Sequence, residues 1–469
     1  MENIDSGTWP VQQPNGAYYQ QDFDLESVDI YTGSGNPIKI RNLVVELSFF
    51  EDIYSFAVSG HVIIRDALGI LEKVKMDGTQ IINIVYGKTK SMPDVQKNNR
   101  KYRIYKSDKS PIANHTSEFL TIYFCSEALM ISEKIKISKS CSGLIATNKE
   151  NNEGIINQIL YNNLMVSKDR VETIEKTYGI YDFIIPRLKP LEAISWLSTY
   201  ARPDESQIGA DMLFFETKNG FNFRSLQSMY KDPPYATYKW QPKNVDSNMD
   251  KGAFGDGVVT VLDLQFVKAM DSLNETSSGT YANKLISIDT LSKSYNITEY
   301  DYVKDYLQNN GKNKPATLNQ NPVTGFSTNR LGLNQTTSYE SSLKVVIGNA
   351  NQRQLQYVKD KPGSVAKDIF IETYVPYRTS QISLANYTVL KLMIPGDSNL
   401  TAGKTINLNM FSLAVDSNNN RQLDQYFSGK YLVSAVRHVI QADNTYQTIV
   451  EIAKESSKLQ FDSPDSTSS

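Results

Sequence analysis

The chain has 469 residues, with 49 basic and 51 acidic side chains and a formal net charge of −2. This length exceeds what one hydrophobic core ordinarily serves, so we expect about two to four domains. The balanced charge gives no support for a protein that binds nucleic acid or anionic membranes, which would carry an excess of Lys and Arg. The 28 tyrosines, with frequent Asn, Ser and Thr, favour β structure and interfaces over helical bundles.

The chain contains two cysteines, Cys125 and Cys141. Two cysteines cannot cross-link a chain of this size, so we infer synthesis in a reducing, intracellular compartment. The segment Met1–Asp5 has neither the basic nor the apolar part of a secretory signal. No apolar run approaches the length needed to span a bilayer. We therefore expect neither a secretory leader nor a membrane-spanning helix.

Short apolar and β-branched runs dominate the first part of the chain after a polar arm at residues 1–20. They alternate with turn signals such as Asp77-Gly78. A series of about five or six short antiparallel strands indicates a small β-barrel. The expected strands are Leu43–Phe50, Ser55–Arg65, Ile81–Tyr86, Tyr102–Tyr105 and Glu118–Phe124.

The composition then becomes typical of helices. Isoleucines and leucines between Cys141 and Leu164 recur at helical spacing, apart from an Asn-rich interruption at 148–153. This spacing predicts one or two helices. Together with the strand and helix that follow, these elements predict a mixed middle domain that ends near Ala210.

A strand, a helix and a hairpin follow in close succession. The aromatic and branched run Tyr181–Ile185 predicts a strand. The helix is expected to begin at Pro190, because the N–H that proline lacks has no helical partner at the first position. Glu192 suits the positive end of the helix dipole in the first turn. Pro203 predicts that the helix ends at about Arg202.

The hairpin is indicated by Asn219-Gly220 between two apolar runs, Met212–Leu226 overall. A two-residue loop would pair Glu216 with Phe223 and mix both faces. A three-residue loop, Lys218-Asn219-Gly220, gives two distinct faces, and a single apolar face is what fixes register. We therefore predict the three-residue loop. It places Leu213, Phe215, Phe221 and Phe223 on one side, and Glu216, Asn222 and Arg224 on the other.

The second half of the chain predicts a long polar loop and a second strand group. Residues 308–340 are rich in Asn, Gln, Thr, Gly and Lys, and Val365–Gln381 has weak helical character. A Ser- and Asp-rich tail at the end is expected to be disordered. Strands or turns are expected at Gly257–Val267, Gly279–Asp289, Tyr300–Tyr306, Val389–Ile394, Lys404–Leu413, Lys430–Ile440 and Tyr446–Ile452.

Motifs that carry chemistry are absent from the sequence. His61 and His438 lie within strand patterns, which favours structural roles. Neither an HExxH motif nor a paired cysteine motif indicates zinc, and no GxSxG elbow occurs. Gly403-Lys404-Thr405 and Gly87-Lys88-Thr89 lack the glycine spacing or the following helix of a phosphate loop. We predict a protein that is not an enzyme, with no catalytic, cofactor-binding or metal-ligating residues.

Two features point to interfaces without identifying one. Trp196 on the predicted helix could anchor an interface, although packing in the core is the favoured interpretation. The polar loop at 308–340 could contact a partner or could be an uninvolved part of the surface.

The order of the segments resembles that of the central baseplate hub protein of contractile-tailed bacteriophages, which is related to the hub-like half of type VI secretion spike proteins. Loop 308–340 and both ends of the chain lie outside this resemblance. It is carried by residues 59–87 (beginning SGHVIIRDALG), 180–226 (beginning IYDFIIPRLKPLEAISWL), 279–295 (GTYANKLISIDTLSKSY), 390–411 (beginning LKLMIPGDSNLTAGK) and 429–456 (beginning GKYLVSAVRHVIQ).

The resemblance implies a mainly β, α+β fold with two tube-type antiparallel β-barrel domains and smaller mixed α/β middle domains. The implied divisions are an N-terminal arm at 1–21, a first barrel at 22–126, a middle domain at 127–210, a second, discontinuous barrel at 211–235 and 368–456, an inserted domain at 236–367, and a disordered tail at 457–469.

The resemblance also implies a function. Three copies would present six barrels as a ring that adapts a threefold spike to a sixfold tail tube and leaves a channel for DNA. Implied partners are further copies in a homotrimer, the central spike protein, the tail tube or its initiator protein, and baseplate wedge proteins, with no membrane and no cofactor. The implied location is the tail baseplate of the virion, after synthesis in the bacterial host cytoplasm.

Other classes remain open at this point. A β-rich receptor- or glycan-binding virion protein would be favoured by clustered aromatic residues in loops, but Trp9, Trp196 and Trp240 are scattered. A hub of a contractile bacteriocin or of a secretion machine would show the same order of segments. A wall-degrading enzyme is disfavoured by the absence of catalytic motifs.

Overall fold

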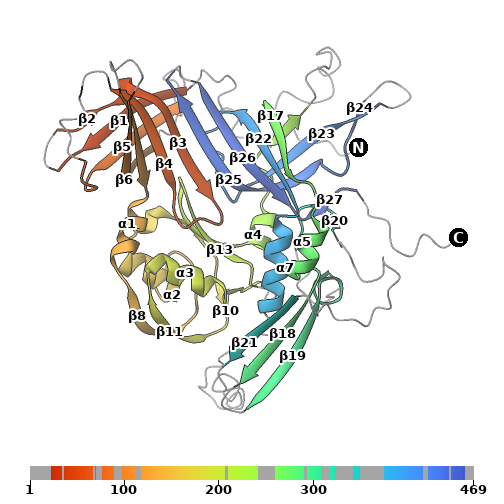
Figure 1. The fold of residues 1–469 in the computed structure, drawn as a ribbon. Helices are drawn as coiled ribbons and strands as arrows, with labels where there is room; N and C mark the ends of the chain where they lie inside the picture. The colour runs from red at the N-terminus through yellow and green to blue at the C-terminus, as the bar shows by residue number, and fades with distance from the viewer. Residues whose placement is uncertain are drawn as a thin grey trace.

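The protein is built mainly from strands, arranged as an upper β layer, a mixed layer below it and a narrow sheet that extends away from both (Figure 1). This confirms the predicted mainly β fold with mixed α/β parts. None of the described helices is long and apolar enough to cross a membrane. The computed structural model describes residues 23–33, 36–66, 69, 76–88, 98–111, 118–205, 210–240, 259–289, 293–307, 316–323, 342–348, 374–415, 421–442 and 445–459.

The first strand group forms one half of the upper layer. Its strands lie in the order β3-β4-β7-β6-β5-β1-β2, with antiparallel neighbours. Residues alternate between inside and outside with the period of two that strands impose: in β4, Val62 and Ile64 are buried and Arg65 is exposed. The strands are β1 (Phe23–Tyr31), β2 (Ile38–Lys39), β3 (Val44–Asp52), β4 (Ser59–Asp66), β5 (Ile81–Lys88), β6 (Asn98–Pro111) and β7 (Glu118–Cys125).

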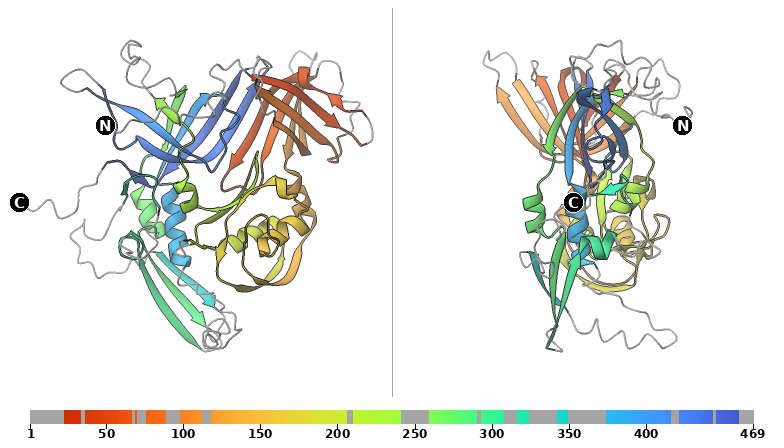
Figure 2. Two further views of the ribbon diagram at one scale, coloured as in Figure 1. Left: turned by 180° about the vertical axis from the view of Figure 1, so that it is seen from behind. Right: turned by 90° about the vertical axis from the view of Figure 1, so that its right-hand side faces the viewer.

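The second strand group forms the other half of the layer and combines segments distant in sequence (Figure 2). Its path runs β15-β23-β25-β26-β22-β17, with β16 beside β15 and β24 beside β23. Leu390, Leu392 and Ile394 of β22 are fully buried in its core. The strands are β15 (Thr237–Trp240), β16 (Val259–Thr260), β17 (Asp263–Lys268), β22 (Thr388–Pro395), β23 (Thr405–Val415), β24 (Arg421–Leu423), β25 (Gly429–Gln441) and β26 (Tyr446–Lys454).

The two groups share one sheet, because β3 pairs antiparallel with β25 from Glu46–Gln441 to Asp52–Ala435. Arg437 donates to Glu46 across this seam at 2.9 Å. Since β25 occupies the second edge of β3, that edge cannot close the first group on itself. Among the described residues, the pairing closes neither group into a complete barrel. The second comes nearest, because β16 pairs with β15 and β17 with β22.

The mixed layer corrects one helix prediction. Residues 141–143 belong to strand β8, whose hydrogen bonds to β11 outweigh the local helical spacing. Helix is confirmed farther along, at α2 and at a π-helix (Ile159–Asn163). The elements are α1 (Glu127–Lys134), β8 (Ile137–Gly143), α2 (Ile155–Gln158), β9 (Val171–Ile174), β10 (Thr177–Tyr178), β11 (Tyr181–Leu188), α3 (Pro190–Ser198) and β12 (Arg202–Pro203).

Helix α3 begins at Pro190, as predicted. The carboxylate of Glu192 accepts a hydrogen bond from the backbone N–H of Lys189 at 3.3 Å, which supports the first turn. The helix ends at Ser198 and not at the predicted Arg202. The Ser198 hydroxyl donates a hydrogen bond to a backbone carbonyl of the last turn, and Arg202 already lies in β12. The helix therefore ends before it reaches Pro203.

The hairpin of β13 (Met212–Thr217) and β14 (Gly220–Ser225) corrects the predicted register. Its turn is Lys218-Asn219, and Phe214, not Phe215, lies opposite Phe223. Both registers considered from the sequence are therefore wrong. Leu213 and Phe215 pack into the second strand group, while Phe214 and Phe223 pack into the mixed layer. Because both faces are buried, alternation of polar and apolar residues could not identify the register.

A narrow sheet extends away from both layers next to the helices α5 and α7 (Figures 1 and 2). Its order is β19-β18-β21, and α7 packs beside it. The predicted strand and turn at Tyr300–Tyr306 is the end of β19 followed by a π-helix (Tyr302–Leu307). The strands of this sheet are β18 (Ala282–Asp289), β19 (Ser294–Asp301) and β21 (Leu343–Gly348), and the helices next to it are α5 (Ser272–Ser278) and α7 (Val375–Ala385). A further helix, α4 (Leu226–Lys231), directly follows the β13–β14 hairpin.

Several predictions fall outside the described residues. These are the arm at 1–21, the tail from 460 and most of loop 308–340. Within that loop, residues 316–323 are described, and β20 (Asn321–Pro322) pairs with β27 (Ser456–Ser457). The proposed domain limits stay a prediction.

Phe223→Asp should destabilise the fold by roughly 4 kcal/mol or more, because it places an unpaired charge at a fully buried position of the hairpin. Ile184→Asp is the matched control, since Ile184 is 76% exposed on β11. It should change stability by less than about 1 kcal/mol. Denaturant unfolding of both variants measures the difference, and equal losses would contradict the burial of this face.

Candidate functional site: the buried polar junction at the hairpin

The tip of the β13–β14 hairpin joins both strand groups. The backbone N–H of Lys218 donates to Glu51 of β3 at 2.6 Å, and the backbone N–H of Ala402, just before β23, donates to the same carboxyl at 3.1 Å. The Lys218 ammonium donates one hydrogen bond to the Ser398 carbonyl and another to Oδ1 of Asn399, which lies 3.1 Å from Nζ. One turn therefore binds β3 on one side and the β22–β23 connection on the other.

Burial sets the protonation of this junction. It raises the pKa of the Glu51 carboxyl to about 7, because the charged form loses its hydration, and the two N–H donors only partly offset this. Burial also lowers the pKa of Lys218 to about 8. His438, opposite Phe49 in the seam, is fully enclosed. Burial and the nearby Lys218 charge lower its pKa to about 3.

A second cluster surrounds Glu216 at the base of the turn. One carboxylate oxygen accepts from the backbone N–H of Val58 at 3.1 Å, and the other lies 3.5 Å from Arg100 and 3.6 Å from Arg170. Arg100 also donates to the Thr217 carbonyl at 2.9 Å. Glu216 is 1% exposed, so the prediction that it faces outward is wrong. It connects the hairpin to β6 and to the residues before β4.

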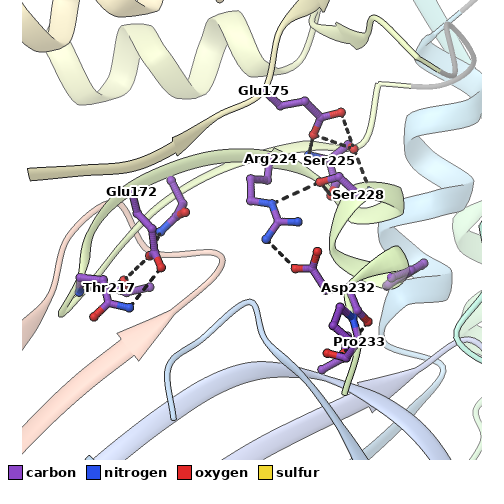
Figure 3. Close-up of polar contacts among 12 residues, drawn as sticks. Glu172, Glu175, Thr217, Arg224, Ser225, Ser228, Asp232 and Pro233 are labelled. Atoms are coloured by element: carbon purple, nitrogen blue, oxygen red, sulfur yellow. Dashed lines mark hydrogen bonds and ion pairs between the residues drawn. The ribbon is translucent and has the colours of Figure 1, made fainter. Parts of the chain in front are cut away.

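Two glutamates in and just after β9 form hydrogen bonds with the hairpin, one near its turn and the other at the end of β14 (Figure 3). Glu172 accepts from the Thr217 hydroxyl at 3.1 Å and from the side-chain amides of Asn219 and Asn222 at 3.1 and 2.8 Å. Glu175 accepts from the backbone N–H of Ser225 at 2.7 Å. The hairpin and β9 therefore form one polar-linked sheet, in which β9 runs parallel to β14.

The far end of the hairpin is joined to the second strand group through the chain after α4. Arg224 forms an ion pair with Asp232 at 2.8 Å (Figure 3). The Asp232 carbonyl accepts from the Thr405 hydroxyl of β23 at 3.1 Å and from the Lys430 ammonium of β25 at 2.5 Å. Both ends of the hairpin thus bind the second group, with its apolar face between them.

The polar groups of this arrangement hydrogen-bond separate parts of the fold to one another. Lys404, of the rejected phosphate-loop pattern, bonds the Asn399 carbonyl at 2.7 Å and lies over the ring of Tyr235. His61 is 3.5 Å from Glu46, and Trp196 packs between Phe183 and Tyr200 in the mixed layer. The part of the chain that the structure describes holds no group of three or more His, Cys, Asp or Glu that could bind a metal ion.

Sequence reasoning missed the residues that make the junction. Glu51, Arg100 and Glu216 are far apart in the chain, and each sits in a locally ordinary pattern. The signals available were a glutamate at the end of an apolar strand and another within an apolar hairpin. Neither signal identifies a partner, because the contacts arise from long-range packing.

The chain is similar to a known phage protein along most of its length. The chain is 23% identical over 422 residues to "Probable baseplate hub protein gp334" of Vibrio phage KVP40, a match that covers 89% of this chain and 91% of the relative. No protein-family model matches the chain. The resemblance to phage baseplate hub proteins inferred from the order of segments is confirmed.

A solved structure of a tail protein resembles this chain in its fold. The 43 kDa tail protein of prophage MuSo2 from Shewanella oneidensis superposes with a TM-score of 0.50 at 6% identity, and the match covers 92% of this chain and 98% of that one. The tail protein from Neisseria meningitidis MC58 gives a TM-score of 0.48 at 10% identity and covers 92% and 96%. The chain therefore shares its fold with a prophage tail protein.

Glu216→Lys should destabilise the chain by roughly 3 kcal/mol or more, because it replaces a buried carboxylate with a buried cation next to Arg100 and Arg170. Glu205→Lys is the control, since Glu205 is exposed, and it should stay within about 0.5 kcal/mol of wild type. Thermal and denaturant unfolding measure both. A Glu216→Lys variant as stable as the control would contradict the buried cluster.

The seam should weaken in acid through His438. Its pKa in the folded chain, about 3, lies below the ordinary value of 6.5, so the unfolded chain binds the proton first. The histidine's contribution is complete above pH 6.5 and is lost as pH falls toward 3, by up to about 1.4 kcal/mol per pH unit. The difference in unfolding free energy between wild type and His438→Gln should shrink accordingly. A difference that is constant with pH would contradict this.

Proposed function

We propose that the chain is a structural hub of a phage tail baseplate. The observation that carries the proposal is the similarity to a baseplate hub protein along 89% of the chain. The fold supports it, because two strand groups share a continuous sheet and are joined to a third, mixed part through buried polar contacts. A protein that must transmit load between neighbours benefits from parts that do not move independently.

The hub acts as a ring of three copies. Each copy carries two strand groups side by side, so three copies offer six similar units to a sixfold tube while keeping threefold symmetry toward a spike. Cyclic closure of this kind needs a heterologous contact between copies. The ring leaves a passage for DNA, contacts the spike and tube proteins and the surrounding baseplate, and carries out no catalysis.

Light scattering after chromatography tests the ring. The full chain, with its spike protein present, should elute as a particle that contains three copies of the chain, because the spike supplies the matching threefold surface. The spike protein measured alone provides the mass to subtract. A particle with two copies, or a chain that stays monomeric with the spike present at every concentration, would overturn the proposed ring.

A further inference from the structure

The narrow sheet has one apolar face that the protein leaves exposed. The register places Tyr295 opposite Ile288, Ile297 opposite Ile286, and Val345 beside Ile286, so these side chains share one face. Tyr295 is 71% exposed and Val345 is 55% exposed. Leu343 lies on the same face beside Lys284, whose ion pair with Glu299 borders the apolar strip.

The opposite face of the same sheet is packed. Leu285 is 1% exposed, and Asn283 donates to the Pro376 carbonyl of α7 at 3.2 Å. The ring of Tyr300 packs edge-on against Tyr377 of α7, with centroids 4.7 Å apart. The sheet is therefore attached through one face, and the apolar residues are on the side turned away from the helix. A sheet with one face packed on the protein and the other open to water normally carries polar residues on the open face.

The two outer edges of this sheet indicate which kind of structural element could bind there. The register of β18 with β19 is continuous from Ala282–Asp301 to Asp289–Ser294, without a bulge. No proline interrupts β19, and no described strand pairs with its outer edge or with the outer edge of β21. Soluble proteins usually protect long edges with bulges, prolines or inward charges. The edges therefore suit further strands.

The size of the face limits the occupant. The four exposed apolar side chains of this face, Tyr295, Ile297, Leu343 and Val345, offer roughly 300–400 Å² of apolar surface. A stable two-body interface needs about 800 Å² from each partner. The face is therefore one part of a larger contact, as it would be in a ring whose copies also touch elsewhere.

We propose that this face and its edges contact the corresponding sheet of a neighbouring copy of the chain, with the β19 edge of one copy beside the β21 edge of the next. A head-to-tail contact of this kind uses both free edges of every sheet, whereas a β19–β19 contact would leave β21 without a strand. In such a contact the exposed Tyr295 and Ile297 of one copy would lie beside Leu343 and Val345 of the next, because side chains on the same face of adjacent strands touch. The inference rests on the proposed ring of three copies and names the surface that holds it together.

Two adjacent substitutions in β19 test the inference in the full chain. Ile297→Lys places a charge on the apolar face, and Asn296→Lys places the same charge on the opposite face of the same strand, where Asn296 is also exposed. Because both positions are exposed, both variants should fold, which thermal unfolding checks. Sedimentation over a range of concentrations, with and without the spike protein, measures assembly. Ile297→Lys should require at least about tenfold more protein to assemble, and Asn296→Lys should match wild type.

The remaining outcomes separate this inference from the proposed function. If wild type and both variants form three-copy particles equally well, the apolar face does not hold copies together and the inference is overturned, while the ring stands. If Ile297→Lys assembles normally but no longer binds the spike protein, the face belongs to the spike contact and the inference is again overturned. If wild type forms no three-copy particle even with the spike, both the ring and this inference fail.

Discussion

The pairing of β3 with β25 is the constraint on which the rest of the structure depends. It makes one sheet of two strand groups, each with its own hydrophobic core. The seam alone would be a hinge between two cores, since a strand pair can twist. The hairpin prevents this by placing the Lys218 backbone on Glu51 of β3 and the Lys218 ammonium on the chain before β23. Backbone pairing and a buried polar contact therefore fix the same relative position.

Burying the charged groups of this junction costs free energy, and that cost disfavours other arrangements of the parts. A buried carboxylate such as Glu216 needs its arginine and N–H partners in place, so any displacement of the hairpin leaves an unpaired charge. An apolar contact in the same place would tolerate sliding. The geometry thus favours one arrangement of the three parts over near alternatives, as the proposed ring of three copies would require.

Local signals predicted a good part of the fold. Pro190 marked the start of α3, and the alternating runs marked most strands of both groups, because these depend on neighbours in sequence. The register of β13 with β14 could not be predicted, since both faces of the hairpin are buried against different cores. Residues 141–143 were predicted as helix and form a strand, because β11 supplies their partner from forty residues away. The junction residues escaped prediction for the same reason: Glu51, Arg100 and Glu216 meet only in the folded chain.

An image of an assembled tail at side-chain resolution would test the proposed hub. We predict three copies of this chain at the junction between tube and spike, with the two strand groups of each copy side by side in a six-unit ring. The β3–β25 seam and the hairpin tip should be intact in every copy. A chain found at the periphery of the baseplate, or in a ring where the two strand groups of one copy have separated at the seam, would contradict it.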